Sequence, residues 1–141
     1  MSTIERATAI AMHAHADQVD KGGAPYITHP ARVSLAVDGN DAKIVAILHD
    51  VVEDSEWTLE QLRDAGFSEA VVNAVNALTH RSGEDYFDAI RRAKADPIAR
   101  IVKLADLADN SDRTRLNEIT DRDERRLEKY AEAREILLED E

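Results

Sequence analysis

Three separated stretches of the sequence combine histidine with carboxylates in largely apolar surroundings. The first is YITHP, in which His29 directly precedes a proline. The second is ILHDVVED, which places His49 and Asp50 side by side after an apolar run. The third is KLADLADN, in which Asp106 follows the run IVKLA. A charged aspartate in such a segment is costly unless a positive group satisfies it. Together the stretches offer two imidazoles and two carboxylates, a donor set that suits a hard or borderline divalent ion and leaves positions for water and substrate.

Two further carboxylates follow the second stretch. Glu53 comes four residues after His49, and Asp54 comes four residues after Asp50, so on one helix each lies a turn further along the same side. There a carboxylate can orient a water molecule, accept its proton and later protonate a leaving group. The alternative is the solvated last turn of a helix, although acidic residues at that end oppose the helix dipole.

The third stretch has its own helical pattern. Lys103, Asp106 and Asn110 follow the i, i+3, i+7 spacing and therefore share one helix face. An alternative for Asp106 and Asp109 is that both are exposed residues on an acidic surface. We assign the two histidines that no neighbouring group completes to surface or packing positions: His13 and His80.

Helix signals run through the whole chain, and almost nothing is typical of a strand. We predict an all-α fold of about eight helices. Pro30 suits the first turn of the second helix and fixes His29 at its entrance. The expected helices cover about residues 3–19, 30–39, 42–54, 59–65, 69–78, 86–95, 97–110 and 121–138, with N-caps at Ser2, Asp41, Thr58, Ser68 and Asp96.

Length and composition predict one domain of closely packed helices. The chain has 141 residues and a mass of 15.7 kDa, so we expect a single domain over residues 1–141 with one sizeable core. Apolar residues make up 43% of the chain and aromatic residues 4%, which leaves the core to alanine, valine, isoleucine and leucine. Such side chains suit helices in close contact.

Charge and cysteine content exclude several classes of function. The net charge of −11 argues against long-range attraction to nucleic acid or to a membrane with anionic lipid, since both need a basic surface. No cysteine is present, which excludes disulfides and thiolate metal ligands. The N-terminus lacks a signal-peptide pattern, and no run approaches the roughly 20 apolar residues that span a bilayer. We expect a soluble cytoplasmic protein that holds any anionic ligand with a local group of cations.

The three stretches occur together and in a recognisable order. DKGGAPYITHP, then ILHDVVEDS with WTLEQL close behind, then VKLADLADN resemble the motifs of the HD-superfamily hydrolase domain of RelA/SpoT-type proteins and small stand-alone alarmone hydrolases. The resemblance spans about residues 7–137 and implies a compact α-helical HD domain. It also implies a bound metal, typically manganese (Mn²⁺), and a catalytic pair for water activation and proton transfer, Glu53 and Asp54. The implied metal ligands are His29, His49, Asp50 and Asp106.

Four positions match residues that contact the nucleotide in this family. Lys21 matches a basic residue before the PY motif, and Asn110 matches the asparagine that faces the sugar. Arg126 and Tyr130, in RRLEKYA, match positions that line the nucleotide pocket. The ordinary alternatives are a loop charge for Lys21, an ion pair on the helix surface for Arg126 and a packing role for Tyr130.

Two positions depart from the family pattern, and both concern the substrate. Asp20 stands where the family usually has a basic residue, and Ala24 replaces the acidic residue of the GEPY variant. These departures affect recognition of the base and phosphates while the metal ligands all match. His15 matches a histidine of the first helix in the family, for which we predict a role in supporting the ligands.

The resemblance implies an enzyme that removes the 3′-pyrophosphate from (p)ppGpp and leaves GDP or GTP. We expect no synthetase domain after the last helix. One alternative is the same chemistry on another phosphorylated nucleotide or metabolite. Another is a non-catalytic regulatory HD domain that binds alarmones, and the pair Glu53 and Asp54 counts against it, because a binding protein has no need to activate water.

Overall fold

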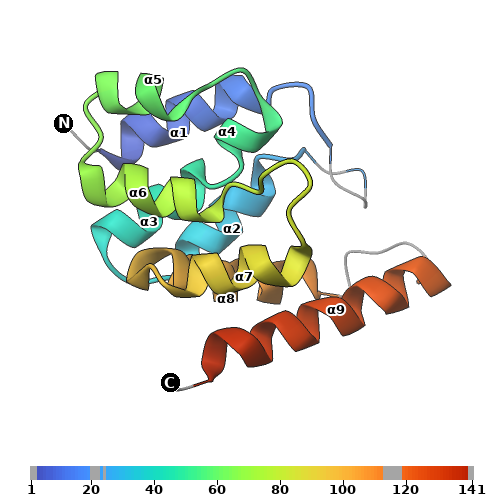
Figure 1. The fold of residues 1–141 in the computed structure, drawn as a ribbon. Helices are drawn as coiled ribbons and strands as arrows, with labels where there is room; N and C mark the ends of the chain where they lie inside the picture. The colour runs from blue at the N-terminus through green and yellow to red at the C-terminus, as the bar shows by residue number, and fades with distance from the viewer. Residues whose placement is uncertain (1–2, 20–22, 24, 113–118, 140–141) are drawn as a thin grey trace.

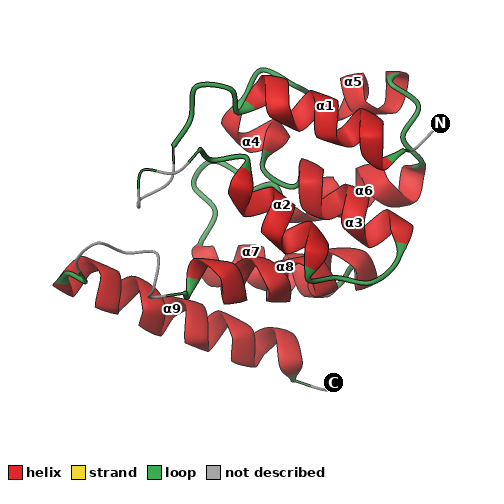
Figure 2. Ribbon diagram, turned by 180° about the vertical axis from the view of Figure 1, so that it is seen from behind, coloured by secondary structure: helices red, strands yellow, loops and turns green. Residues whose placement is uncertain are grey.

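Helices form the regular secondary structure of residues 3–19, 23, 25–112 and 119–139, which the computed structural model describes (Figure 1). Within these residues there is no β-strand, and an isolated antiparallel bridge joins Val19 to Pro25. Figure 2 shows the same all-helical arrangement from behind, so the prediction of an all-α fold is confirmed. The nine helices of the described residues are α1 (Ile4–Ala14), α2 (Thr28–Leu35), α3 (Asn40–Leu48), α4 (Val51–Asp54), α5 (Leu59–Asp64), α6 (Glu69–Leu78), α7 (Tyr86–Lys94), α8 (Pro97–Asn110) and α9 (Asp121–Leu138).

Side-chain caps start α5, α6 and α8 where the sequence predicts them. Thr58 and Gln61 form the predicted capping box at the start of α5. The hydroxyl of Ser68 accepts from a backbone N–H in the first turn of α6, and the carboxylate of Asp96 accepts from two in α8. These caps satisfy N–H groups that have no partner within the helix.

The first helix begins and ends elsewhere than predicted. Its N-cap is Thr3, whose hydroxyl accepts from the backbone N–H of Arg6, whereas the predicted cap, Ser2, lies outside the described residues. α1 ends at Ala14 instead of near residue 19, because the backbone leaves the helical region at His15 (φ −106°, ψ 14°). The residues that follow are therefore turned towards the start of α2 and do not extend the helix.

The second and third helices also differ from prediction at their ends. α2 starts two residues before Pro30, so His29 lies inside its first turn instead of at its entrance. The proline is tolerated there because its missing N–H would have no partner within the helix. α3 starts after Gly39 (φ 94°), a conformation that glycine adopts without strain, and not after Asp41.

The predicted helix over residues 42–54 is divided into α3 and α4. His49 and Asp50 form the turn between them, and both side chains make hydrogen bonds there: His49 to the carbonyl oxygen of Ala46, and Asp50 to the hydroxyl of Tyr26. The backbone N–H of Asp54 still donates to the carbonyl of Asp50 at 2.9 Å. Asp50 and Asp54 therefore keep the expected relation of one helical turn.

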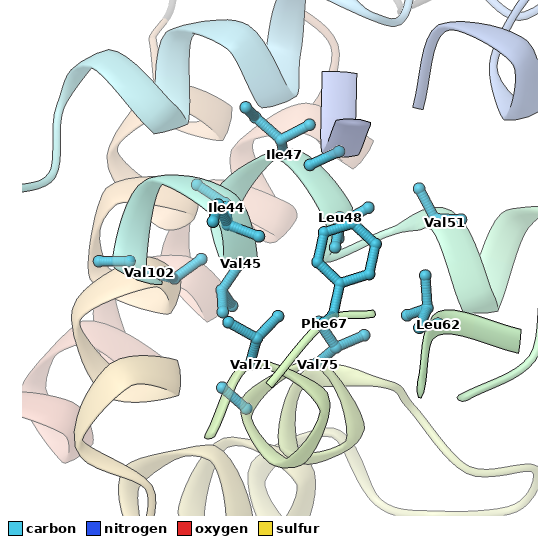
Figure 3. Close-up of a cluster of buried hydrophobic side chains, with 14 of the residues drawn as sticks. Ile44, Val45, Ile47, Leu48, Val51, Leu62, Phe67, Val71, Val75 and Val102 are labelled. Carbon is cyan, nitrogen blue, oxygen red and sulfur yellow. The ribbon is translucent and has the colours of Figure 1, made fainter. Parts of the chain in front are cut away.

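The main apolar cluster surrounds α3, which packs against α1, α2, α6 and α8. Ile44, Val45 and Leu48 of α3 are fully buried, and Figure 3 shows them together with Val71 and Val75 of α6. Burying an aliphatic side chain of this size contributes about 1.5–3 kcal/mol. The predicted core of small aliphatic side chains is present, and it fixes the carboxyl end of α3 from several sides.

A smaller apolar cluster attaches α9 to α7 and α8, along one side of the molecule (Figure 1). Its buried members are Ile90, Leu107, Ala133 and Leu137. Among the helices that the structure describes, none is long and apolar enough to cross a membrane.

Candidate metal centre

The four predicted ligands meet where α2, α8 and the turn after α3 come together. Among the described residues, His29, His49 and Asp50 each offer a ligand atom within 4.8 Å of the other two. The Oδ1 atom of Asp106 lies 2.8 Å from Nε2 of His29 and 3.2 Å from Nε2 of His49. Nε2 of His49 is also 3.1 Å from Oδ2 of Asp50. Side chains up to 77 positions apart in the sequence therefore converge on one point.

Both imidazole rings are held so that Nε2 faces this point. The Nδ1 atom of His49 donates to the carbonyl oxygen of Ala46, and that of His29 donates to Oδ2 of Asp109 at 2.6 Å. Asp109 is itself held by Arg32, whose Nε donates to its Oδ1 at 2.8 Å. Partners of this kind fix the tautomer and direction of metal-binding histidines. The donor set and its support therefore fit a divalent ion.

The charges of the centre shift the ionisation of its members. Burial would lower the pKa of His49, but Asp50 and Asp106 raise it well above its ordinary value. Burial would raise the pKa of Asp50, but the positive charge of His49 lowers it to about 2. In the same way Lys103, 2.9 Å from Oδ2 of Asp106, helps to hold the pKa of that buried carboxyl well below its usual range. Both carboxylates are therefore charged at neutral pH, as ligands for a cation must be.

Tyr26 connects the centre to the first helix. Its hydroxyl donates to Oδ2 of Asp50, and burial, followed by the charge of Asp50, raises the pKa of Tyr26. The ring of His15 lies 4.8 Å from the ring of Tyr26, and Nδ1 of His15 lies 2.9 Å from Oε1 of Gln18. Gln18 in turn donates to the backbone carbonyl of Asp54 at 3.3 Å. His15 thus contacts Tyr26, which binds Asp50. The predicted role of His15 in supporting the metal ligands stays a prediction.

A cavity of about 250 Å³ adjoins the centre, and Glu53 lines it together with His49 and Asp50. Oε1 of Glu53 accepts from the backbone N–H of His80 at 2.9 Å, which fixes this carboxylate at the cavity wall. Asp54 is not among the residues that line the cavity. Burial, and next the charges of Asp50 and Glu53, raise the pKa of Asp54 to about 6.

Comparisons with known proteins identify relatives of this chain. No family model matches the chain. A probable GTP pyrophosphokinase from Mycobacterium leprae is 35% identical over 123 residues, which cover 78% of this chain and 16% of that protein. A guanosine-3′,5′-bis(diphosphate) 3′-pyrophosphohydrolase from Aquifex aeolicus is 33% identical over 119 residues, covering 76% of this chain and 17% of that protein. The chain therefore spans only about a sixth of the length of these relatives.

The fold has a close counterpart among solved structures. A metazoan orthologue of SpoT, described as hydrolysing ppGpp and acting in starvation responses, matches with a TM-score of 0.79. The match covers 98% of this chain and 86% of the other at 21% identity, which supports the fold. The sequence matches cover one segment of these relatives and the fold is that of a SpoT orthologue, so the predicted resemblance to the HD domain of RelA/SpoT-type proteins is confirmed.

The predicted nucleotide-contacting residues of this HD domain are placed less uniformly than the ligands. Asn110 lies in the centre, where its side-chain amide donates to Oδ1 of Asp106 at 3.2 Å. Arg126 makes an ion pair with Asp123, one turn earlier on α9, and this pair is largely buried. Tyr130 packs against the smaller apolar cluster, and burial raises its pKa. These contacts are the ordinary alternatives for Arg126 and Tyr130, and neither tests nucleotide binding. Three positions lie outside the described residues: Asp20, Lys21 and Ala24.

Several residues that support the HD centre are not evident from the sequence. The pattern makes Asp109 only a candidate surface acid, yet its side chain is 11% exposed and orients His29. Its position three residues after Asp106 is a usable signal, because such residues are neighbours on a helix. Tyr26 begins the stretch YITHP, but nothing in the sequence assigns it a role. His80 is exposed, as predicted, but its backbone also holds Glu53.

Proposed function

We propose that this HD domain, over residues 1–141, is a metal-dependent phosphohydrolase that removes the 3′-pyrophosphate from (p)ppGpp-like nucleotides. The observation that carries the proposal is the convergence of two imidazoles and two carboxylates beside a cavity lined by Glu53. The names of the relatives supply the substrate class. A cytoplasmic location stays a prediction, as does the lack of nucleic-acid and membrane partners, which the net charge of −11 supports.

We propose that one divalent ion, Mn²⁺ by the family resemblance, is held by four side chains: His29, His49, Asp50 and Asp106. When bound, such an ion polarises a phosphoryl oxygen and makes water more acidic. The support for this ligand set is the direction of both rings, which Ala46 and Asp109 fix through hydrogen bonds. Further support is that Asp106 is buried and Asp50 partly buried, so that a cation at this point would offset their charges together with Lys103.

The chain's own residues account for the proton transfers. Glu53 would accept a proton from the attacking water, because its carboxylate lines the cavity and is held by the N–H of His80. Asp54, whose pKa is raised to about 6, is the candidate for protonating the 3′ oxygen that leaves. Asn110 would face the sugar from beside Asp106. Lys21, Arg126 and Tyr130 remain the proposed contacts to the rest of the nucleotide.

A second candidate is the same hydrolysis on a different phosphorylated nucleotide or metabolite. It is favoured by Asp20, which places a negative charge where the family has a basic residue. A guanosine tetraphosphate carries several negative charges, so this residue should weaken its binding to a protein of net charge −11. A non-catalytic regulatory domain is less well supported, since it gives no role to the fixed carboxylate of Glu53.

The test is hydrolysis of ppGpp by the Mn²⁺-loaded protein, with the products separated by ion-exchange chromatography. We expect GDP and pyrophosphate, and no turnover by metal-stripped protein. A panel of other phosphorylated nucleotides is tested in parallel, with wild type and with Asp20→Arg. If ppGpp is the substrate, Asp20→Arg should improve kcat/KM, mainly through KM. A correctly metallated protein that is inert towards ppGpp but cleaves another phosphoester would overturn the alarmone assignment and leave the phosphohydrolase assignment standing.

A further inference from the structure

The carboxylate of Glu53, the proposed acceptor of the water proton, is held by an N–H group of a loop. Glu53 is exposed on α4, and its Oε1 accepts from the backbone N–H of His80, in the loop between α6 and α7 (Figure 1). An exposed glutamate loses conformational entropy when it is confined to one orientation, so its position depends on the partner that confines it. The residues that direct the N–H of His80 therefore also direct Glu53.

The peptide group between Thr79 and His80 has partners at both of its polar ends. Its N–H donates to Glu53 at 2.9 Å. Its oxygen, which belongs to Thr79, accepts from Nη2 of Arg92 at 2.9 Å and from Nη1 of Arg81 at 2.8 Å. The peptide bond is trans, so its C=O and N–H point in opposite directions in one plane. Two guanidinium groups on the oxygen thus aim the N–H at Glu53, and they also polarise it as a donor.

Arg92, on α7, is the centre of this arrangement. A guanidinium has five N–H groups, and each of them has a partner here. Nε and Nη2 donate to the two carboxylate oxygens of Glu84 at 3.0 and 2.7 Å. The other three N–H groups donate to backbone oxygens at the carboxyl end of α6, those of Asn76, Ala77 and Thr79. Because carbonyls at this end have no N–H partner four residues later in the helix, Arg92 fixes the last turn of α6 together with the start of the loop.

Glu84 extends the support to the other side of His80. Its Oε1 accepts from the backbone N–H of Arg81 at 3.1 Å, and its own N–H donates to the carbonyl oxygen of Arg81 at 3.0 Å. The hydrogen bond from Arg92, and next that from Arg81, lower the pKa of Glu84 to about 2, so this carboxylate is charged at neutral pH. His80 therefore lies between two residues, Thr79 and Arg81, that are both bound to the same ion pair.

We propose that Arg92 is a positioning residue for the hydrolysis, which orients Glu53 through the Thr79–His80 peptide group. The inference rests on the proposed function, in which Glu53 accepts the proton of the attacking water. A direct contact between Arg92 and a phosphate group would break one of the five hydrogen bonds that the guanidinium already makes. Arg92 thus acts through another residue, because it sets the direction from which the carboxylate of Glu53 meets the water.

The experiment uses Arg92→Lys, which keeps the charge. An ammonium has three donors and cannot bind both oxygens of Glu84 while it also reaches three carbonyl oxygens. We expect kcat of the Mn²⁺-loaded protein on ppGpp to fall about tenfold or more, because catalysis is sensitive to small displacements of the reacting groups. KM and metal content should stay at the wild-type level. Arg91→Lys, at the exposed neighbour that pairs with Asp88, is the matched control and should leave kcat unchanged.

A double substitution separates positioning from a general loss of structure. If Arg92 acts through Glu53, Arg92→Lys should lower kcat little further in a protein that already carries Glu53→Gln, because effects within one unit are not additive. A merely structural role would lower kcat by the same factor in both backgrounds, and that result would overturn the proposal. Arg81→Met removes the other donor to the Thr79 oxygen from an exposed position, so it carries the same comparison if Arg92→Lys does not fold.

A second measurement needs no turnover and is therefore separate from the test of the proposed function. Exchange of the His80 amide proton with solvent, followed by NMR, is slowed by the hydrogen bond to Glu53. Glu53→Ala and Arg92→Lys should each speed this exchange, and the two together should speed it no more than Glu53→Ala alone. Arg91→Lys should leave the exchange at the wild-type rate.

The two measurements distinguish failure of the inference from failure of the proposed function. A protein that is inert towards ppGpp, but whose His80 amide exchanges faster in Arg92→Lys, would retain the link from Arg92 to Glu53 and lose the alarmone substrate. A protein that hydrolyses ppGpp, while Arg92→Lys changes neither kcat nor this exchange, would retain the substrate and lose the role of Arg92.

Discussion

The helix α3 belongs to two regions that are built on different physical principles. Along most of its length Ile44, Val45 and Leu48 are buried in the main apolar cluster, where attraction is not directional. At its end, His49 is equally enclosed, with 4% of its surface exposed, but it is held by hydrogen bonds to named atoms of Ala46 and Asp106. The first region tolerates other apolar side chains of similar volume, whereas the second depends on each atom.

This difference separates what stabilises the fold from what performs chemistry. A cavity opened in the apolar cluster lowers the free energy of unfolding roughly in proportion to the volume of that cavity. A missing partner in the metal centre leaves a charged group buried without compensation. Substitutions in the two regions should therefore change different measured quantities.

The largest effect is expected from Asp50→Ala, which removes one of the two carboxylates that balance a cation. We expect binding of a divalent ion, and the rise of Tm that accompanies it, to be abolished, since a ligand stabilises only the state that binds it. Metal content by elemental analysis and Tm with and without Mn²⁺ provide the measurement. Asp41→Ala, an exposed aspartate at the other end of α3, is the control. Full metal occupancy in Asp50→Ala would place the ion elsewhere.

In the apolar cluster, Leu62→Ala should lower the free energy of unfolding by about 2–5 kcal/mol. Leu62 of α5 is fully buried in the cluster. Its apolar side chain forms no hydrogen bond, so it holds none of the proposed ligands in place. Denaturant unfolding of the metal-free protein measures the loss. The remaining folded protein should bind Mn²⁺ with wild-type affinity. A large drop in that affinity would show that the two regions are coupled.

Glu53→Gln replaces one carboxylate oxygen by an amide nitrogen. This substitution should reduce kcat by about 10² while metal content stays at the wild-type level. The amide oxygen can still accept from the N–H of His80, so the side chain keeps its place but loses its basicity. Steady-state kinetics on the substrate found in the screen measures the effect. Glu56→Gln, an exposed neighbour, should leave kcat unchanged. Normal turnover of Glu53→Gln would mean that Glu53 is only a solvated residue at the end of a helix.

The smallest of these effects is expected from Asp109→Asn, which weakens the support of His29 without removing a ligand. Loss of such a supporting carboxylate costs about 10–100-fold in metal affinity. Titration with Mn²⁺ gives the Kd, and Asp88→Asn, in an exposed ion pair on α7, controls for the change of charge. Equal Kd values for the two variants would mean that Arg32 and Asp109 form only a structural ion pair.

Local features of the fold could be predicted from the sequence because their causes are local. The caps of α5, α6 and α8 each depend on a side chain and a backbone group two or three residues away. The division between α3 and α4 was not predicted, because one of its hydrogen bonds comes from Tyr26, 24 positions from Asp50. The apolar residues on both sides of the turn, 44–48 and 51–52, continue one helical pattern and hide it.

The metal centre could be predicted in part because each of its motifs is also a short local stretch of sequence. Its four proposed ligands lie in short motifs that resemble those of the HD domain, and the structure brings them together. Asp109 could not be separated from a surface acid, because its burial depends on Arg32 and His29, which precede it by 77 and 80 positions.

The attachment of α9 has a consequence for motion. Two buried side chains of this helix, Ala133 and Leu137, join the smaller apolar cluster, and both lie in its carboxyl-terminal half. Local opening needs little free energy where few apolar contacts must separate, so the amino-terminal half of α9 can fray while the cluster around α3 stays closed. Arg126 lies in that half and Tyr130 directly follows it, so a nucleotide that contacts them would slow the exchange of backbone amide protons there. The helix would then report occupancy of the neighbouring centre through its hydrogen exchange, without any change of fold.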